Sequence, residues 1–225
     1  MTVLWEALKL ITSGDRELVT ICMTSLRFAT TSIILASLVG IPLGFILKLK
    51  TFPGRKSILI IINSLMALPT VVVGLLVYSM VTRTGPLGSM GLLFTPVAVI
   101  IGQIILVLPI VTSMVYGSVS NMDPRLPDTL KTLGASGVSY NLMLLKEMKG
   151  PILSAVLAGF GRVIGEVGVS MMLGGNIRWY TRTITTTISL QTSKGEFEMG
   201  LALGIVLMAI AFILNFLIHL AVHND

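Results

Sequence analysis

Arg162 and Glu166 are the two charged residues in an otherwise apolar stretch, so they are the first candidates for chemistry in this sequence. They stand four residues apart, which places both on one face of a helix and lets them pair. Pairing reduces the cost of burying either charge within a membrane. Such a pair either ties its helix to neighbouring helices or serves the passage of an ion or proton, and the residues alone leave both roles open.

Two other polar side chains also interrupt apolar runs. Arg27 lies about nine residues into the first run, roughly 13 Å deep by helical rise. It either snorkels to the membrane surface, tethers its helix to a neighbouring one, or contacts a passing ion. Gln103 is expected to hydrogen-bond between helices, as polar side chains within membranes commonly do.

Pro69 and Pro109 fall in the middle of two further apolar runs. Each proline frees a backbone carbonyl, which is tolerated at membrane depth only where protein or a water-filled cavity satisfies it. The segments 68–74 and 108–110 are therefore predicted to line a central passage. The residues expected along this passage are Pro69, Val71, Gly74, Pro109, Arg162, Glu166, Asn176 and Arg27.

The composition identifies the class of protein. Hydrophobic residues make up 54% of the 225 residues and charged residues only 12%, with a mean hydropathy of +0.93. A soluble domain of this length is far less apolar, so the chain is expected to be an integral membrane protein. Its net charge of +6 then indicates basic loops rather than a nucleic-acid partner. A single cysteine, Cys22, excludes an internal disulfide and a multi-cysteine metal site, and no metal site is expected.

The elements that must position these residues are all helices. Residues 1–11, which include Trp5, are expected to form a short helix lying in the membrane interface. Five spans are predicted in a single transmembrane domain, 1–225, at about 18–47, 57–82, 96–121, 151–172 and 200–222. Residues 177–199 are rich in threonine and charge, so they are expected to be partly helical or re-entrant and packed on protein at the outer face.

The loop at 123–150 is the longest polar interruption. Pro127 is well placed to open a short helix that should end at Gly134. A second helix follows, in which Val138, Leu142, Leu145 and Met148 recur at helical spacing as one apolar stripe. On the pattern alone, this hairpin is either a solvated loop packed on its own helices or a knob that another protein grips.

This loop resembles the EAA signature of ABC-importer permeases. Asp128 takes the acidic position, Gly134 the glycine position and Leu144 the isoleucine position. The sequence departs from the signature where Thr129 and Leu130 replace two alanines, and where Lys146–Glu147 replaces Leu-Pro. The flanks LPTVVVGLLVYSMVTRTGPLG, from residue 68, and GRVIGEVGVSMMLGGNIR, from residue 161, resemble tungstate-type permeases, relatives of the molybdate and sulfate permeases. The likeness runs from about Thr24 to the last span.

The resemblance implies an all-α integral membrane protein of the type I ABC-importer permease kind, with the 123–150 segment as its coupling loop. An ABC ATPase would dock on this loop, and two copies of the chain would form a homodimer served by an outer anion-binding protein. The residues expected to contact the ATPase are Asp128, Thr129, Leu130, Gly134, Ala135, Leu142 and Leu145. The expected cargo is a tetrahedral oxyanion, most of all tungstate, with molybdate or sulfate as alternatives.

The sequence contains no GxxxxGK[ST] phosphate loop. The chain is therefore expected to bind no cofactor and to be no enzyme, and ATP and magnesium are expected on the partner ATPase. A stand-alone secondary carrier or channel is a weaker alternative, because such carriers usually have internal repeats and more spans. An intramembrane hydrolase is weaker still, because Ser170 lies outside any GxSxG pattern and the histidines lie at the far C-terminus.

The basic residues predict the topology. The densest cluster, LKLKTFPGRK at 47–56, directly follows the first span. The positive-inside rule places this cluster and the 123–150 loop in the cytoplasm. A multi-pass protein of the cell membrane is thus expected, with lipid around it, the N-terminus outside and the C-terminus in the cytoplasm.

Overall fold

The computed structural model describes residues 2–123, 125–134 and 136–223. The regular elements in these ranges are all helical, as predicted. In chain order they are α1 (Thr2–Thr12), α2 (Arg16–Leu49), α3 (Arg55–Met66), α4 (Thr70–Val81), η1 (Gly88–Met90), α5 (Pro96–Ser120), α6 (Arg125–Thr132), α7 (Gly137–Glu147), α8 (Lys149–Ile164), α9 (Gly168–Gly174), α10 (Ile184–Lys194) and α11 (Phe197–His223).

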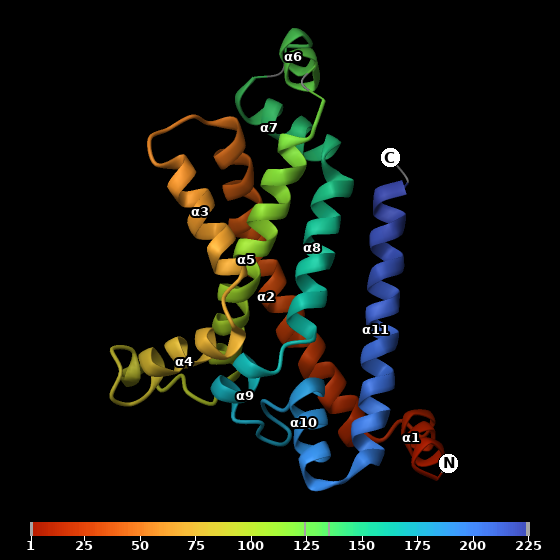
Figure 1. The fold of residues 1–225 in the computed structure, drawn as a ribbon. Coiled ribbons are helices and arrows are strands. Elements are labelled where there is room, and N and C mark those ends of the chain that lie inside the picture. Colours follow the sequence, from red (N-terminus) through yellow and green to blue (C-terminus); the bar gives the residue numbers. More distant parts are fainter. Residues whose placement is uncertain (1, 124, 135, 224–225) are drawn as a thin grey trace.

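Three helices, α2, α5 and α11, are long and apolar enough to cross a membrane by themselves. Two more candidate spans are bent pairs: α3 with α4, bent by 103°, and α8 with α9, bent by 60°. The described residues thus contain three candidate spans, or five if each pair counts as one, and the sequence predicts five. The predicted spans 57–82 and 151–172 are not single helices, because each contains a short break that redirects the chain (Figure 1).

The break between α3 and α4 is caused by Pro69. Proline disfavours the helical conformation of the residue before it, so α3 ends ahead of it. Pro69 itself is extended, with φ −61° and ψ 131°, and stands directly before the first residue of α4. Its missing N–H is not needed at that position, since the first amides of a helix have no intrahelical partner. From there α4 runs sideways and packs against α9 (Figure 1).

The centre of the bundle is formed by α2, α5 and α8. The hydroxyl of Ser32 in α2 donates a 2.8 Å hydrogen bond to Oε1 of Gln103 in α5, which confirms the predicted interhelical role of Gln103. A Cβ on Gly44 of α2 would lie 2.8 Å from the Val115 side chain of α5, so the two backbones approach closely. The fully buried side chains at this centre include Ala29, Ala36, Val107, Val111, Val115 and Ala155.

The connecting segments divide between the two ends of the bundle (Figure 1). One end holds α6, α7 and the loop between α2 and α3; the other holds α1, α4, α9 and α10. The basic residues of 48–56 and 125–149 thus gather at one end of the molecule. This arrangement is the one that the predicted topology requires, since it assigns both basic segments to the same side of the membrane.

The threonine-rich segment after α9 is partly helical and packed on protein, as predicted. Thr183 caps α10 through a reciprocal capping box with Thr186. The main-chain N–H of Ile184 donates a 2.7 Å hydrogen bond to the hydroxyl of Ser25 in α2. The threonines of this segment that are buried are Thr181, Thr183, Thr185, Thr186 and Thr187.

Candidate functional site

The two helix breaks meet in space. A Cβ placed on Gly168, the first residue of α9, would lie 3.1 Å from Cγ2 of Val71 and 3.2 Å from Oγ1 of Thr70, at the start of α4. One turn further along α4, a Cβ on Gly74 would lie 3.0 Å from Sδ of Met172. The short helices α4 and α9 therefore pack closely through small residues, with their first turns side by side.

Glu166 holds the break between α8 and α9 by three contacts. Its Oε2 lies 2.9 Å from Nη1 of Arg162, and its Oε1 accepts a 3.1 Å hydrogen bond from the main-chain N–H of Val169. The hydroxyl of Thr185 donates a 2.7 Å hydrogen bond to the main-chain carbonyl of Glu166. Glu166 thus joins α8, α9 and the N-terminal turn of α10, and its carboxylate caps α9, where helix geometry favours negative charge.

The two charges of this pair differ in exposure. The Glu166 side chain is 3% exposed and the Arg162 side chain is 42% exposed. A carboxylate buried this deeply is tolerated only with charged and hydrogen-bonding partners, which Arg162 and Val169 supply. A guanidinium has five N–H donors, so the outward side of Arg162 is able to donate to an anion while Nη1 holds Glu166. The predicted helix pairing is confirmed, and the geometry is compatible with a structural and a pathway role.

The structure brings only some of the predicted passage residues together. Val71, Gly74, Arg162 and Glu166 gather around the two breaks, next to Pro69. Arg27 is exposed on α2, and Pro109 is buried within α5. Asn176 lies in the turn after α9 with φ 50°, and its Nδ2 donates to the Thr186 carbonyl at 3.4 Å. Among the contacts of the described residues, none links Arg27, Pro109 or Asn176 to the Arg162–Glu166 pair.

An ion-pair cluster lies at the end of the bundle opposite α6 and α7, and the local sequence did not predict it. Glu17, at the start of α2, accepts from Nε of Arg178 at 3.0 Å and from Nη1 of Arg182 at 3.1 Å. The hydrogen bond to Glu17 raises the pKa of Arg178 above its usual value. Arg178 also lies over the ring of Trp179, 5.2 Å from its centroid. These contacts join segments more than 160 residues apart, so the only available signal was the presence of two arginines in the segment 177–199.

The predicted coupling loop, residues 123–150, forms two short helices with a turn at Gly134. Asp123 caps α6 by accepting from the N–H of Arg125 at 2.8 Å, so α6 starts before Pro127 rather than at it. Gly134 has φ +82°, in the left-handed region that favours glycine, as its predicted role at the end of this helix requires. Asp128 and Thr129 are exposed on α6. Leu130 packs against the core of the bundle, and Ala135 lies outside the described residues.

The apolar residues of α7 point in two directions, which corrects the predicted single stripe. Leu144 is fully buried and Met148, just after the helix, is 6% exposed. Leu142 is 60% exposed and Leu145 is 36% exposed, so these two do not share the buried side. The side chain of Val138 is not among those that the structure describes. α7 therefore uses Leu144 to pack on its own bundle and presents Leu142 outward.

The chain is similar to known membrane components of transport systems. Residues 40–223 match the family described as "Binding-protein-dependent transport system inner membrane component". The chain is 43% identical over 214 residues to the tungstate uptake system permease protein TupB of Campylobacter jejuni, which covers 95% of this chain and 90% of that protein. It is 38% identical to the TupB of Peptoclostridium acidaminophilum, over 95% and 93% of the two chains. A probable anion ABC transporter permease of Haloferax volcanii is 37% identical over 88% of each chain.

The family match covers most of the chain, including the two breaks, the Arg162–Glu166 pair and the predicted coupling loop. The architecture agrees with it, since the described helices include three to five candidate spans of a multi-pass membrane protein. The expected family and the expected helical membrane fold are thus confirmed. This chain belongs to the binding-protein-dependent transport system inner membrane components.

Proposed function

We propose that the chain is the permease subunit of an ATP-driven uptake system for tungstate. The observation that carries this proposal is the 43% and 38% identity to two tungstate uptake permeases over nearly the whole chain. Sulfate and molybdenum permeases are more distant, with 25% identity to the CysT protein of Salmonella typhimurium and 28% to the ModB protein of Haemophilus influenzae. Tungstate is therefore the cargo that the similarities favour over molybdate and sulfate.

Coupling to ATP is assigned to a partner. The chain has no phosphate-binding loop, so an ABC ATPase with bound ATP and magnesium would supply the energy. Its dock would be the outward side of the coupling loop, where Asp128, Thr129 and Leu142 are exposed. The turn at Gly134 sets the angle between α6 and α7, so it would transmit movement of the ATPase to α8.

The transport path is assigned to the region of the two helix breaks. Gly168 lies close to Thr70, Val71 and the Glu166 carboxylate there. Arg162 pairs with that carboxylate and keeps further N–H donors on its exposed side. A fixed, unpaired arginine would hold a dianion too tightly for turnover, and Glu166 offsets its charge. Two copies of the chain related by a two-fold axis would place two such regions around one passage. An outer anion-binding protein would deliver the anion to the end that carries α9 and α10.

Reconstitution tests the proposal. The permease, its ATPase and its binding protein are placed in proteoliposomes, and uptake of tungstate is measured with ATP on the ATPase side. Uptake is expected to require ATP and binding protein, and to resist excess sulfate. Uptake that is unchanged without the ATPase would favour a secondary carrier and overturn the proposal. Faster uptake of molybdate than of tungstate, with the matching binding protein, would keep the permease role and reassign the anion.

A further inference from the structure

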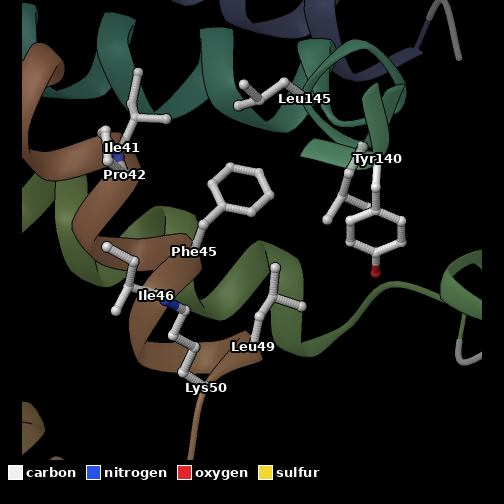
Figure 2. A pocket seen from close by; sticks show the side chains of 9 residues that line it. Ile41, Pro42, Phe45, Ile46, Leu49, Lys50, Tyr140 and Leu145 are labelled. Atoms are coloured by element: carbon white, nitrogen blue, oxygen red, sulfur yellow. The ribbon is translucent and has the colours of Figure 1, made fainter. Parts of the chain in front are cut away.

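An apolar groove runs between the last turns of α2 and the helix α7 (Figure 2). Its volume is about 530 Å³, within the range of sites that bind small molecules. α2 contributes Ile41, Pro42, Phe45, Ile46, Leu49 and Lys50, and α7 contributes Tyr140, Leu144 and Leu145. Apart from the ammonium of Lys50 and the hydroxyl of Tyr140, these side chains are apolar.

The chain itself leaves this groove open. α7 packs mainly against α6 and α8 rather than along α2. Ile46 and Leu49 remain 42% and 38% exposed on the α2 wall. Phe45 and Leu144 form the buried floor, at 9% and 0% exposure. An apolar occupant would therefore gain contacts that no described side chain of this protein makes.

The distribution of charge selects the kind of occupant. The groove lies beside the last turns of a span, at the end of the bundle where a membrane's headgroups would be. Its single cationic side chain, Lys50, stands at the C-terminal cap of α2, whereas Ile41 and Pro42 lie more than two turns back towards the middle of the span. An apolar groove with one ammonium group at its end complements an apolar chain that ends at one negative charge.

We propose that this groove binds an anionic phospholipid. One acyl chain lies between α2 and α7 against Phe45, and the phosphate pairs with the Lys50 ammonium. The lipid would fill the space between a membrane span and the loop proposed to carry the ATPase. It would thus stabilise the position of α7. The site does not depend on the transported anion, so it stands or fails separately from the tungstate assignment.

Fluorescence quenching by brominated lipid tests the site on the full chain. Trp5 and Trp179 are replaced by phenylalanine, and Ile46→Trp places a single reporter on the groove wall. The matched reporter is Phe212→Trp, on a 70% exposed position of α11 away from the groove. Both are reconstituted with brominated phosphatidylglycerol or brominated phosphatidylcholine. The preference for phosphatidylglycerol is expected to be about fivefold greater at position 46, the effect of one lysine near the surface.

Charge variants locate the headgroup. Lys50→Gln should remove the extra preference at position 46. Lys56→Gln, which removes the same charge from the first turn of α3, should retain it. Equal preference at both reporters would show ordinary surrounding lipid and overturn the proposal. An equal loss of this preference in both lysine variants would show an effect of diffuse surface charge, and it would also overturn the proposal. If neither lipid quenches position 46 in the assembled transporter, a protein occupies the groove and the lipid site is wrong. Leu49→Trp, also on the α2 wall, repeats the comparison should Ile46→Trp not insert.

Discussion

The hydroxyl of Thr185 donates a 2.7 Å hydrogen bond to the main-chain carbonyl of Glu166. This bond fastens the first turn of α10 to the break between α8 and α9, where a helix end leaves carbonyls without intrahelical partners. Thr185 is 5% exposed, so water is a poor substitute for its hydroxyl. The break is therefore stabilised from a segment that is nineteen residues away in the chain.

Replacing Thr185 tests this contact. Thr185→Val keeps the side-chain shape but leaves the Glu166 carbonyl unpaired, which should cost about 1–3 kcal/mol of stability. The thermal midpoint of the purified permease in detergent is expected to fall. Thr185→Ser keeps the hydroxyl and should lower the midpoint much less. Equal midpoints for the valine and serine variants would mean that the hydrogen bond does not stabilise the break.

The Arg162–Glu166 pair is tested by removing one charge or both. Arg162→Met alone leaves a buried carboxylate without its cation, so it should destabilise the permease more than the double variant Arg162→Met with Glu166→Gln. Glutamine is chosen over methionine because its carbonyl oxygen still accepts from the N–H of Val169. The measurement is the thermal midpoint, followed by tungstate uptake. If the pair is purely structural, the double variant transports normally; a stable double variant with poor uptake would place Arg162 in the path. A double variant less stable than the single one contradicts the burial argument.

Gly134 is predicted to be required for coupling. A β-branched residue is strained at φ +82°, and forcing the left-handed conformation costs roughly 1–2 kcal/mol. Gly134→Val should therefore shift the turn between α6 and α7 and abolish uptake while the protein still inserts. Gly134→Asn, which tolerates this conformation better, should retain most uptake. The valine variant is then assayed for ATP-dependent uptake at matched membrane levels, and normal rates would refute the coupling role of the turn.

The exposed and buried sides of α7 should respond differently to the same leucine-to-glutamate substitution. Leu142→Glu places a charge on a 60% exposed position, so it should leave the thermal midpoint nearly unchanged and weaken binding of the ATPase. Leu144→Glu buries a charge in the core and should prevent stable folding. Co-purification with the ATPase measures the first effect and detergent-resistant yield the second. Undiminished ATPase binding by Leu142→Glu would exclude this side of α7 from the dock.

Cysteine labelling tests the proposed passage along α4. In a Cys22→Ser background, single cysteines are placed from Val71 to Val77 and treated with a small polar thiol reagent. Val73 and Val77 are 3% and 6% exposed, and Gly74 is buried, so these positions should be protected. Labelling is expected only among the exposed positions, which are Val71, Val72, Leu75 and Leu76. Protection at all seven positions would exclude a water-filled passage beside this helix.

Local signals in the sequence predicted many of the helices. Asp15 is an N-cap residue by type, and its carboxylate accepts from Leu18 N–H at 2.9 Å at the start of α2. Gln103 was placed between helices because an amide at membrane depth needs a partner, and Ser32 is that partner. Apolar runs of sufficient length gave α2, α5 and α11. These features depend on residues close in sequence or on burial alone, so they can be read without the fold.

The direction of the chain after each break was not predictable. Pro69 indicates that a helix is interrupted. The 103° turn, however, depends on the packing of α4 against α9, a contact between segments about 95 residues apart. The prediction of a single apolar stripe on α7 was wrong for a similar reason. Leu142, Leu144 and Leu145 are chemically alike, and only the position of the bundle decides which one is buried. The partners of Glu17 also lie at the other end of the chain.

The length of α2 has a mechanical consequence. Its 34 residues extend for about 51 Å, well beyond the roughly 30 Å of membrane hydrocarbon. Glu17 near its first residue is clamped by Arg178 and Arg182, and Phe45 near its last forms the groove beside α7. Because α2 is this long, a tilt of about 5° about its Glu17 end displaces its Phe45 end by about 4 Å. Tilting α2 at the arginine clamp therefore moves its Phe45 end, which is the α2 wall of the groove, relative to α7.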